Sequence, residues 1–286
     1  MTPDAWREQG ETIRVPEGDV FVIDRPGPTA TLPVFVLHGF PTSSWDFEET
    51  IAHVTPHHRV VLFDFPGFGF SAKPADHAYS LFEQADVACA VAKAKGLSRV
   101  ILWAHDMGTS VAAELCARRE RGLLPFEIAK LVLMNGSVHM EMASPTVGQR
   151  ILASPLGKPF ARLSRERVFQ AQMRRVFAKP PSNEVLHAMW TLISRDEGTQ
   201  RLPMTIGYMA ERRRFKHRWI GALDRLDIPT LIAWGEQDPV ALLPIAQRLA
   251  REIATATLVT WPDLGHYPQV EEPERVARTV LDFTRA

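Results

Sequence analysis

The feature that most constrains this chain is the alternation of short apolar runs, rich in β-branched and aromatic residues, with longer amphipathic stretches. Continuous apolar runs suit strands that are covered on both faces, and the amphipathic stretches suit the helices that cover them. The alternation therefore predicts a parallel sheet with helices on both sides. The predicted strands are Val20–Ile23, Leu32–Leu37, Val60–Phe63, Val100–Trp103, Leu131–Met134, Thr230–Ala233 and Thr257–Thr260.

Two of the predicted helices have clear start signals. Ser80 and Glu83 have the spacing of a capping box, and Gly96 suits the left-handed residue that ends a helix. The last helix is predicted from Pro273 to about Arg285, because proline suits a first helical turn and the acids before it suit the helix dipole.

The strand–helix alternation stops after Asn135-Gly136 and resumes near Leu223. Between them the chain has helical periodicity without a convincing strand, with helices predicted over Asn183–Arg195 and Arg201–Trp219. A helical insertion between two strands of a sheet is a cap by position. The predicted domains are a first core part (1–137), a helical cap (138–222) and a second core part (223–286).

Composition bounds the class of protein. The 286 residues are 45% hydrophobic, and 33 Lys plus Arg balance 33 Asp plus Glu, which excludes a disordered or collagen-like chain. Zero net charge argues against a nucleic-acid partner, and the absence of a long apolar run argues against a membrane partner. Two cysteines cannot form a disulfide framework, so we expect a cytoplasmic protein. We expect this protein to be a monomer or a homodimer.

The zero net charge is the sum of a basic part and an acidic part of the chain. Residues 138–222 contain 15 Lys plus Arg and 6 Asp plus Glu, a balance of +9, so the remainder carries −9. We expect Arg212, Arg213 and Arg214 to lie on a solvated helix face, since exposed ion pairs contribute little. The alternative is that the basic cap docks electrostatically on the acidic core, in which case activity would depend on ionic strength.

One predicted strand leads directly into a helix through Ala104-His105-Asp106-Met107-Gly108. This pattern of a small residue, a nucleophile and a glycine is typical of a nucleophile elbow, a sharp turn that lifts one side chain above the sheet. Asp106 occupies the nucleophile position. The alternative is an aspartate that merely caps the helix.

Three further sites follow other strands. His38-Gly39-Phe40-Pro41 would aim the Phe40 N–H at the same point as the Met107 N–H, forming an oxyanion hole, or is simply a tight turn. Asp238 follows a later strand, and His266 follows the last one. The chain order of nucleophile, acid and histidine is typical of a hydrolase triad. Taken alone, Asp238 would be interpreted as a turn residue and His266 as a surface residue.

These motifs resemble the α/β-hydrolase branch that contains epoxide hydrolases and haloalkane dehalogenases. The residues that carry the resemblance cover nearly the whole core: His38-Gly39-Phe40-Pro41, Asp64-x-x-Gly67-x-Gly69-x-Ser71-x-Lys73-Pro74, His105-Asp106-x-Gly108, Asp238 and Gly265-His266. The resemblance implies an α/β fold with a mostly parallel eight-stranded sheet flanked by helices and an inserted all-helical cap. A narrower likeness, in Phe40–Ser44 and Glu211–Leu223, is to mesoderm-specific transcript proteins.

The resemblance also implies a mechanism without a metal or cofactor. A carboxylate is ionised at neutral pH, so Asp106 would attack a saturated carbon and form an alkyl-enzyme ester. His266, oriented by Asp238, would then activate a water to hydrolyse that ester. The substrate would be a small hydrophobic molecule. Whether it is an epoxide or a haloalkane depends on which side chain stabilises the leaving oxygen or halide.

Tyr208 favours an epoxide. It lies in the cap about twenty residues before Ile228-Pro229, where epoxide hydrolases carry a ring-opening tyrosine, although it could simply pack on an amphipathic helix. These enzymes use two such donors, and His187 or His139 is a weak candidate for the second. We therefore expect a hydrolase that converts epoxides to vicinal diols.

Three other functions remain open. A haloalkane dehalogenase would carry Trp where this chain has Met107, and in one subgroup Asn where it has Phe40, leaving Trp190 or Trp219 as halide donors. A non-catalytic hydrolase-fold protein is suggested by the mesoderm-specific transcript likeness. A carboxylesterase is least favoured, because Ser110 lies one helical turn beyond the elbow.

Overall fold

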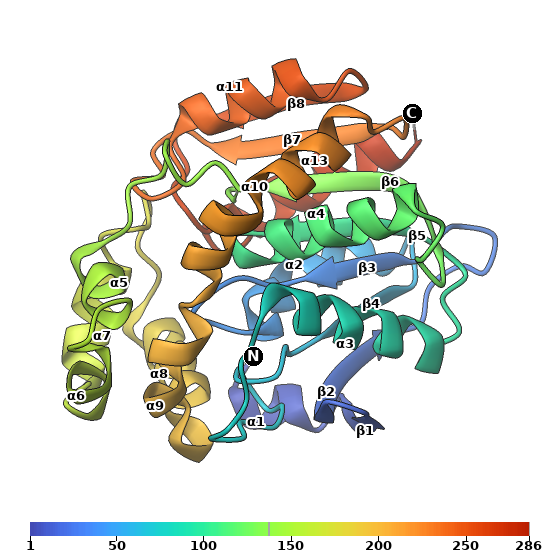
Figure 1. Cartoon of the computed structure of the whole chain (residues 1–286). Helices are drawn as coiled ribbons and strands as arrows, with labels where there is room; N and C mark the ends of the chain where they lie inside the picture. The colour runs from blue at the N-terminus through green and yellow to red at the C-terminus, as the bar shows by residue number, and fades with distance from the viewer. Residues whose placement is uncertain (137, 286) are drawn as a thin grey trace.

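An eight-stranded sheet forms the centre of the molecule (Figure 1). The computed structural model describes residues 1–136 and 138–285. Strand order is β1-β2-β4-β3-β5-β6-β7-β8, and all neighbours are parallel except β1–β2 and β2–β4. The predicted mostly parallel, eight-stranded sheet is confirmed. The strands are β1 (Glu11–Val15), β2 (Gly18–Arg25), β3 (Val34–Leu37), β4 (Val60–Phe63), β5 (Arg99–His105), β6 (Glu127–Met134), β7 (Thr230–Gly235) and β8 (Ala256–Trp261).

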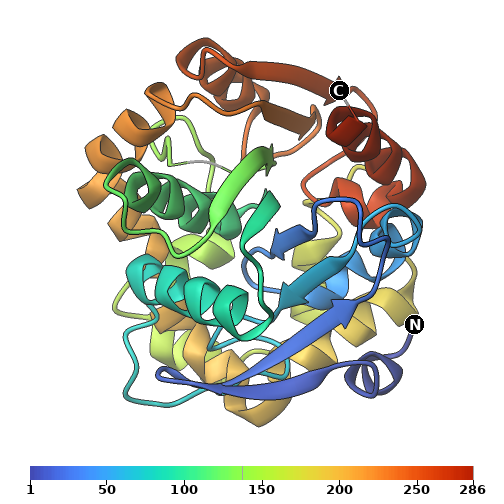
Figure 2. The ribbon, with the colours of Figure 1, turned by 90° about the vertical axis from the view of Figure 1, so that its right-hand side faces the viewer.

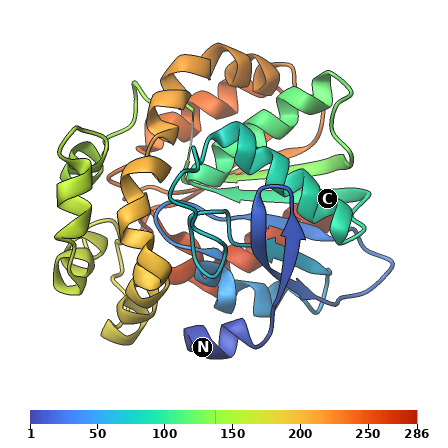
Figure 3. The same cartoon turned by 60° about the horizontal axis from the view of Figure 1, so that its bottom comes forward.

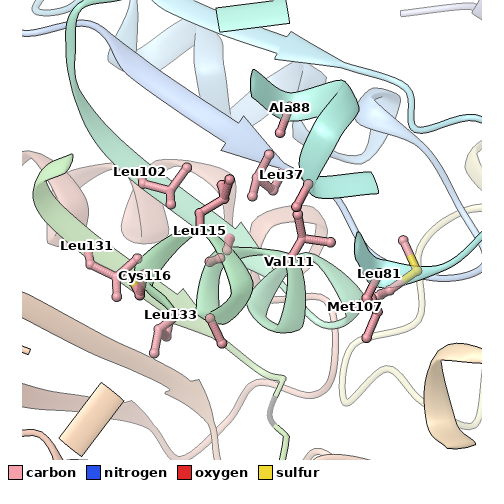
Figure 4. Close-up of a cluster of buried hydrophobic side chains, with 14 of the residues drawn as sticks. Leu37, Leu81, Ala88, Leu102, Met107, Val111, Leu115, Cys116, Leu131 and Leu133 are labelled. Atoms are coloured by element: carbon pink, nitrogen blue, oxygen red, sulfur yellow. The ribbon is translucent and has the colours of Figure 1, made fainter. Parts of the chain in front are cut away.

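Helices cover both faces of the sheet (Figure 2), and an apolar cluster lies between the sheet and the helices on each face. Alternate strand residues point to opposite faces, so Leu37 and Leu102 belong to one cluster while Val36 and Ile101 belong to the other. Figure 4 shows the first cluster, where α3 and α4 pack on β3, β5 and β6. The core helices are α2 (Glu48–Val54), α3 (Leu81–Ala94), α4 (Met107–Glu120), α11 (Leu243–Glu252) and α13 (Pro273–Arg285), with the short α1 (Pro3–Arg7), η1 (Ser44–Phe47) and α12 (Pro268–Glu271).

The predicted helix signals are confirmed where the structure tests them. Ser80 Oγ accepts from the Glu83 N–H, and the Glu83 carboxylate accepts from the Ser80 N–H, which is the expected capping box of α3. Gly96 follows that helix with φ of +63°. Helix α13 begins at Pro273 and ends at Arg285.

Between β6 and β7 the described residues form helices joined by turns and irregular loops, without a strand (Figure 3). The helix predicted over Arg201–Trp219 is in fact two, because the chain turns at Ile206-Gly207. The second of these, α10, continues to Asp224, past the predicted end of the cap, and lies along the core helix α4 (Figure 1). These elements are α5 (Val147–Leu152), α6 (Gly157–Arg162), α7 (Glu166–Met173), α8 (Asn183–Ser194), η2 (Arg195–Glu197), α9 (Gly198–Thr205) and α10 (Tyr208–Asp224).

The domain limits at 137/138 and 222/223 stay predictions. Residue 137 itself lies outside the described residues. Among the helices that the structure describes, none combines the length and apolar character needed to cross a bilayer.

Candidate active site

Asp106 lies at the sharp turn between β5 and α4, as predicted. Its backbone has φ of +44° and ψ of −111°, a conformation that non-glycine residues rarely adopt and that costs energy. The turn is closely packed: a Cβ on Gly108 would lie 2.5 Å from the Leu37 carbonyl oxygen, and one on Gly136 would lie 2.3 Å from the Asp106 carbonyl oxygen. Glycine at these positions lets the neighbouring strands approach and hold the strained residue in place.

The loop after β3 faces the Asp106 carboxylate. The Phe40 N–H donates to Asp106 Oδ2 over 2.9 Å. Met107 is the first residue of α4, so its N–H has no carbonyl partner within the helix. The two predicted oxyanion-hole residues therefore lie next to the predicted nucleophile, with Phe40 already binding one of its oxygens.

His266 and Asp238 are brought together as predicted. His266 Nδ1 lies 2.7 Å from Asp238 Oδ2, and both side chains are buried. The other Asp238 oxygen accepts from the N–H groups of Val240 at 2.7 Å and Ala241 at 2.9 Å. The carboxylate is thus fixed in place and can orient the imidazole.

Asn135 is a partner of the predicted triad residue Asp238, and the sequence did not point to it. Its Nδ2 donates to Asp238 Oδ2 over 2.8 Å, and its Oδ1 accepts from the Gly235 N–H over 3.0 Å. Asn135 directly follows β6 and has φ of +42°. The available signal was its position: it is an asparagine at the carboxyl end of a strand that neighbours β7, which leads to Asp238.

The electrostatics suit a histidine that changes its protonation during a reaction. Burial by itself lowers the pKa of His266, but the charge and hydrogen bond of Asp238, together with the charge of Asp106, raise it to about 8. Burial lowers the pKa of the adjacent His105 to about 4, so this ring is neutral at physiological pH. Its Nε2 lies 2.8 Å from the His266 carbonyl oxygen and donates to it, which fixes the backbone at His266.

Arg212 contradicts the prediction of a solvated helix face. Its side chain is buried, with Nε donating to Ser110 Oγ over 2.7 Å and Nη2 donating to the Asp106 carbonyl oxygen over 2.9 Å. Nη2 also lies 3.8 Å from Asp106 Oδ1. Consecutive residues lie about 100° apart around a helix, so only one of three adjacent arginines faces the core. Arg213 and Arg214 are exposed, as predicted.

Ser110, considered as an esterase nucleophile, is instead the hydrogen-bond acceptor of Arg212. Its position one helical turn beyond the elbow therefore serves to bind a cap side chain.

Tyr208 is buried beside the nucleophile. Its ring packs against that of Phe40, with centroids 5.7 Å apart, and the Arg212 guanidinium lies 4.5 Å from the Tyr208 ring centroid. Burial and then the charge of Asp106 raise the pKa of Tyr208 well above its usual value, against the opposing effects of Arg212 and of a hydrogen bond with Gln149. The phenol therefore stays protonated and available as a donor at physiological pH.

A cavity of about 200 Å³ lies between the cap and the core. From the core it is lined by Phe40 and His266, whereas Asp106 and Tyr208 are not among its lining residues, and its cap lining is mainly apolar. Gln149, the partner of Tyr208, also lines the cavity, although sequence analysis did not single it out. The cavity is therefore an apolar chamber with a few polar groups in its lining.

Four other cap residues are candidate donors to the leaving group on the basis of the sequence. His187 is exposed and lies 2.7 Å from Glu166, while His139 Nε2 lies 2.7 Å from Glu252, so both histidines pair with glutamates instead of lining the cavity. Trp219 donates to Glu114 on α4 over 2.9 Å. Trp190 does line the cavity.

The sequence has well-defined relatives. A family model described as alpha/beta hydrolase fold matches residues 33–273. LipZ of Mycobacterium tuberculosis, named as a hydrolase, is 41% identical over 280 residues, covering 97% of this chain and 96% of LipZ. The mesoderm-specific transcript homolog protein of Homo sapiens is 34% identical over 290 residues, covering 98% of this chain and 87% of that protein.

The fold likewise matches solved structures. A loop variant of the haloalkane dehalogenase DbeA from Bradyrhizobium elkanii superposes with a TM-score of 0.81 at 22% identity, covering 96% of each chain. The family model matches most of the chain, and the strand order and the position of Asp106 at the elbow between β5 and α4 agree with it. The chain therefore belongs to the alpha/beta hydrolase fold family.

Proposed function

We propose that this hydrolase-fold protein opens epoxides to vicinal diols through an ester on Asp106. The observation that carries the proposal is Tyr208, a buried phenol that stays protonated, packs against Phe40 and is hydrogen-bonded to Gln149. Gln149 lines the cavity, whereas Tyr208 and Asp106 are not themselves among its lining residues. An epoxide leaves as an alkoxide, which needs a proton or a strong donor, and in this proposal Tyr208 supplies it. Gln149 is our candidate for the second donor.

The hydrogen bonds of Asp106 distinguish its two oxygens. Oδ2 accepts from the Phe40 N–H, so it already occupies the oxyanion hole. In the proposed first step Oδ1 attacks an epoxide carbon, that carbon's bond to the ring oxygen breaks, and the ring oxygen takes the Tyr208 proton. Oδ2 then becomes the ester carbonyl oxygen without moving from its N–H partner.

The second step uses His266 as the base. The neutral imidazole takes a proton from water, and the resulting hydroxide attacks the ester carbonyl carbon. The negative charge develops on Oδ2, where the N–H groups of Phe40 and Met107 stabilise it. Collapse releases the diol and the Asp106 carboxylate, and the proton on His266 returns to the Tyr208 phenolate through solvent.

A variant that stops between the steps tests the proposal. His266→Ala incubated with styrene oxide should gain the mass of one substrate, and peptide mapping should place it on Asp106. Asp106→Asn/His266→Ala, treated identically, is the control and should gain nothing. An unchanged mass for His266→Ala contradicts the ester mechanism, whereas turnover by the unmutated protein that disappears in Asp106→Ala excludes a non-catalytic role.

Haloalkane dehalogenation is a second candidate, favoured by one observation. Trp190 lines the cavity, and an indole N–H is a suitable donor to a departing halide. The ester chemistry would be the same. Halide release from a panel of haloalkanes, lost in Trp190→Phe, would support this function, and no release under conditions where epoxides turn over removes it.

A further inference from the structure

Exposed apolar side chains gather on one part of the cap. Among the described residues seven large apolar side chains are exposed, and four of these lie between residues 147 and 168. They are Val147 (71% exposed) on α5, Leu156 (66%) and Leu163 (70%) at the two ends of α6, and Val168 (48%) on α7. These three helices lie together at the edge of the molecule, away from the sheet (Figures 1 and 3). Single exposed apolar side chains are normal on a protein surface, whereas several gathered in one place indicate an interaction surface.

Cations without acidic partners lie among these apolar residues. Lys158, Arg162, Arg165 and Arg167 are all exposed, and within the part of the chain that the structure describes none of the four forms an ion pair. Residues 146–175 hold seven Lys plus Arg and a single acid, Glu166, which is paired with His187. We call these four cations and the four apolar side chains the apolar–basic face.

The apolar–basic face is continuous with the substrate cavity. Leu163 and Val168 are exposed at the surface and also line the cavity, as does Arg165. The mouth of the cavity therefore opens within this face. An apolar molecule could pass from a surrounding apolar phase into the chamber without crossing water.

We propose that the apolar–basic face binds the surface of an anionic lipid bilayer and takes its apolar substrate from it. Apolar side chains would enter the boundary between headgroups and acyl chains while the flanking cations bind acidic headgroups. The absence of a spanning segment does not bear on this kind of attachment, which lies in the plane of the interface. The inference concerns the source of the substrate and does not depend on whether it is an epoxide.

The charge of the face argues against its being a symmetric dimer contact. A two-fold interface brings a patch against its own copy. Here that would place the unpaired cations of one molecule against the same cations of the other, without acids to compensate. A negatively charged bilayer is the partner whose charge and apolar character both complement the face.

Vesicle flotation tests the proposal. The full chain should float with vesicles of phosphatidylcholine mixed with phosphatidylglycerol, and much less with phosphatidylcholine alone. Lys158→Gln/Arg162→Gln should weaken partitioning by roughly 25-fold, given about 1 kcal/mol for each cation near an anionic surface. Val147→Ser/Leu156→Ser should weaken it as well, because insertion needs the apolar side chains.

A matched control lies at the opposite end of the sheet. Leu123 is 68% exposed in the turn between α4 and β6, and Arg121 beside it is exposed, so Arg121→Gln/Leu123→Ser makes a comparable change far from the cap. This variant should float like the unmutated protein, and thermal unfolding checks that all variants are folded. The proposal is overturned if the unmutated protein does not float, or if the control loses as much binding as the cap variants.

Two further outcomes would also overturn it. Binding that Val147→Ser/Leu156→Ser leaves unchanged would mean simple charge attraction without insertion. Concentration-dependent dimers in sedimentation velocity that the cap variants abolish would assign the face to a second copy of the chain, whose core is acidic.

Discussion

The Arg212 guanidinium donates to the backbone carbonyl oxygen of Asp106 over 2.9 Å, so a cap helix binds the residue that the elbow strains. The same side chain reaches Ser110 and lies over the Tyr208 ring. One buried cation therefore connects the predicted nucleophile, the core helix that follows it and the predicted proton donor. This places Arg212 as a positioning residue.

Replacing Arg212 should impair catalysis and shift its pH dependence. Arg212→Ala leaves Ser110 Oγ and the Asp106 carbonyl without a charged donor, and we expect a loss of roughly 2 kcal/mol in stability. Because the charge of Arg212 opposes protonation of His266, its removal should also move the pH profile of turnover to higher pH. Steady-state kinetics against pH measure this shift. Arg213→Ala, at an exposed neighbour, is the control, and identical profiles for both variants would leave Arg212 with a purely structural role.

Tyr208→Phe should lower epoxide turnover by roughly 10²-fold, because the alkoxide loses its proton donor while the ring remains packed against Phe40. Single-turnover kinetics should show the loss in ester formation, with ester hydrolysis unchanged. Tyr79→Phe is the matched control, since the Tyr79 hydroxyl donates to the Pro74 carbonyl oxygen and not to a cavity-lining residue such as Gln149. Equal ester formation in Tyr208→Phe and the unmutated protein would contradict the proposed role.

The pKa of His266 should fall when the ester forms. Asp106 contributes to raising it to about 8, and esterification removes that negative charge. Ester hydrolysis, which needs the neutral imidazole, should therefore rise with pH to a plateau with a midpoint below 8. Asp106→Asn mimics the neutral ester, and NMR titration of His266 in this variant should give a lower pKa than in the unmutated protein. A pKa that is the same in both proteins would rule out this coupling.

Glu114 should anchor the cap helix α10 much more strongly than Glu120 does. Glu114 is buried on α4 and accepts from Arg218 at 2.7 and 2.9 Å and from Trp219 at 2.9 Å, whereas the pair of Arg225 with Glu120 is exposed. Glu114→Gln should cost roughly 3–5 kcal/mol of unfolding free energy, and Glu120→Gln far less, because solvent screens an exposed ion pair.

Denaturant unfolding of the two variants makes this comparison. Buried pairs are weakly screened, so salt should change the contribution of Glu114 little. Cap docking is therefore expected to involve charge without the strong salt dependence that exposed pairs would give. Equal losses for Glu114→Gln and Glu120→Gln would contradict this.

Asp46 should make the protein less stable as pH rises. Burial, aided by the charge of Asp64 and opposed by Thr42 and His266, raises its pKa to about 8, against a value near ~3.9 in the unfolded chain. The folded state therefore holds the extra proton between these values, and the stability present at low pH is lost as pH rises through about 8. Asp46→Asn should reduce this loss, measured by denaturant unfolding at low and high pH. A pH dependence unchanged in Asp46→Asn would contradict the assignment.

The sequence was sufficient for most of the core because the relevant signals are local. Apolar runs located seven strands, but β1 was not among those predicted, since Glu11–Val15 lies at the sheet edge with most of its side chains at least partly exposed and so lacks the apolar pattern. The helix break at Ile206-Gly207 was missed for a related reason: apolar periodicity continues across it, while the turn depends on how α9 and α10 pack.

The residues of the candidate site likewise fall into those that the sequence predicted and those that only the structure revealed. Asp106, Asp238 and His266 each follow a strand, and parallel strands bring such positions to one edge of the sheet, so the sequence alone determined the elbow, the triad order and the fold family. Only the tertiary structure decided the roles of Asn135, Gln149 and Arg212. Whether an arginine in a run of three is solvated or buried against the nucleophile depends on the rotation of α10 over α4, and that rotation is set by contacts between residues about a hundred positions apart, such as Arg218 with Glu114.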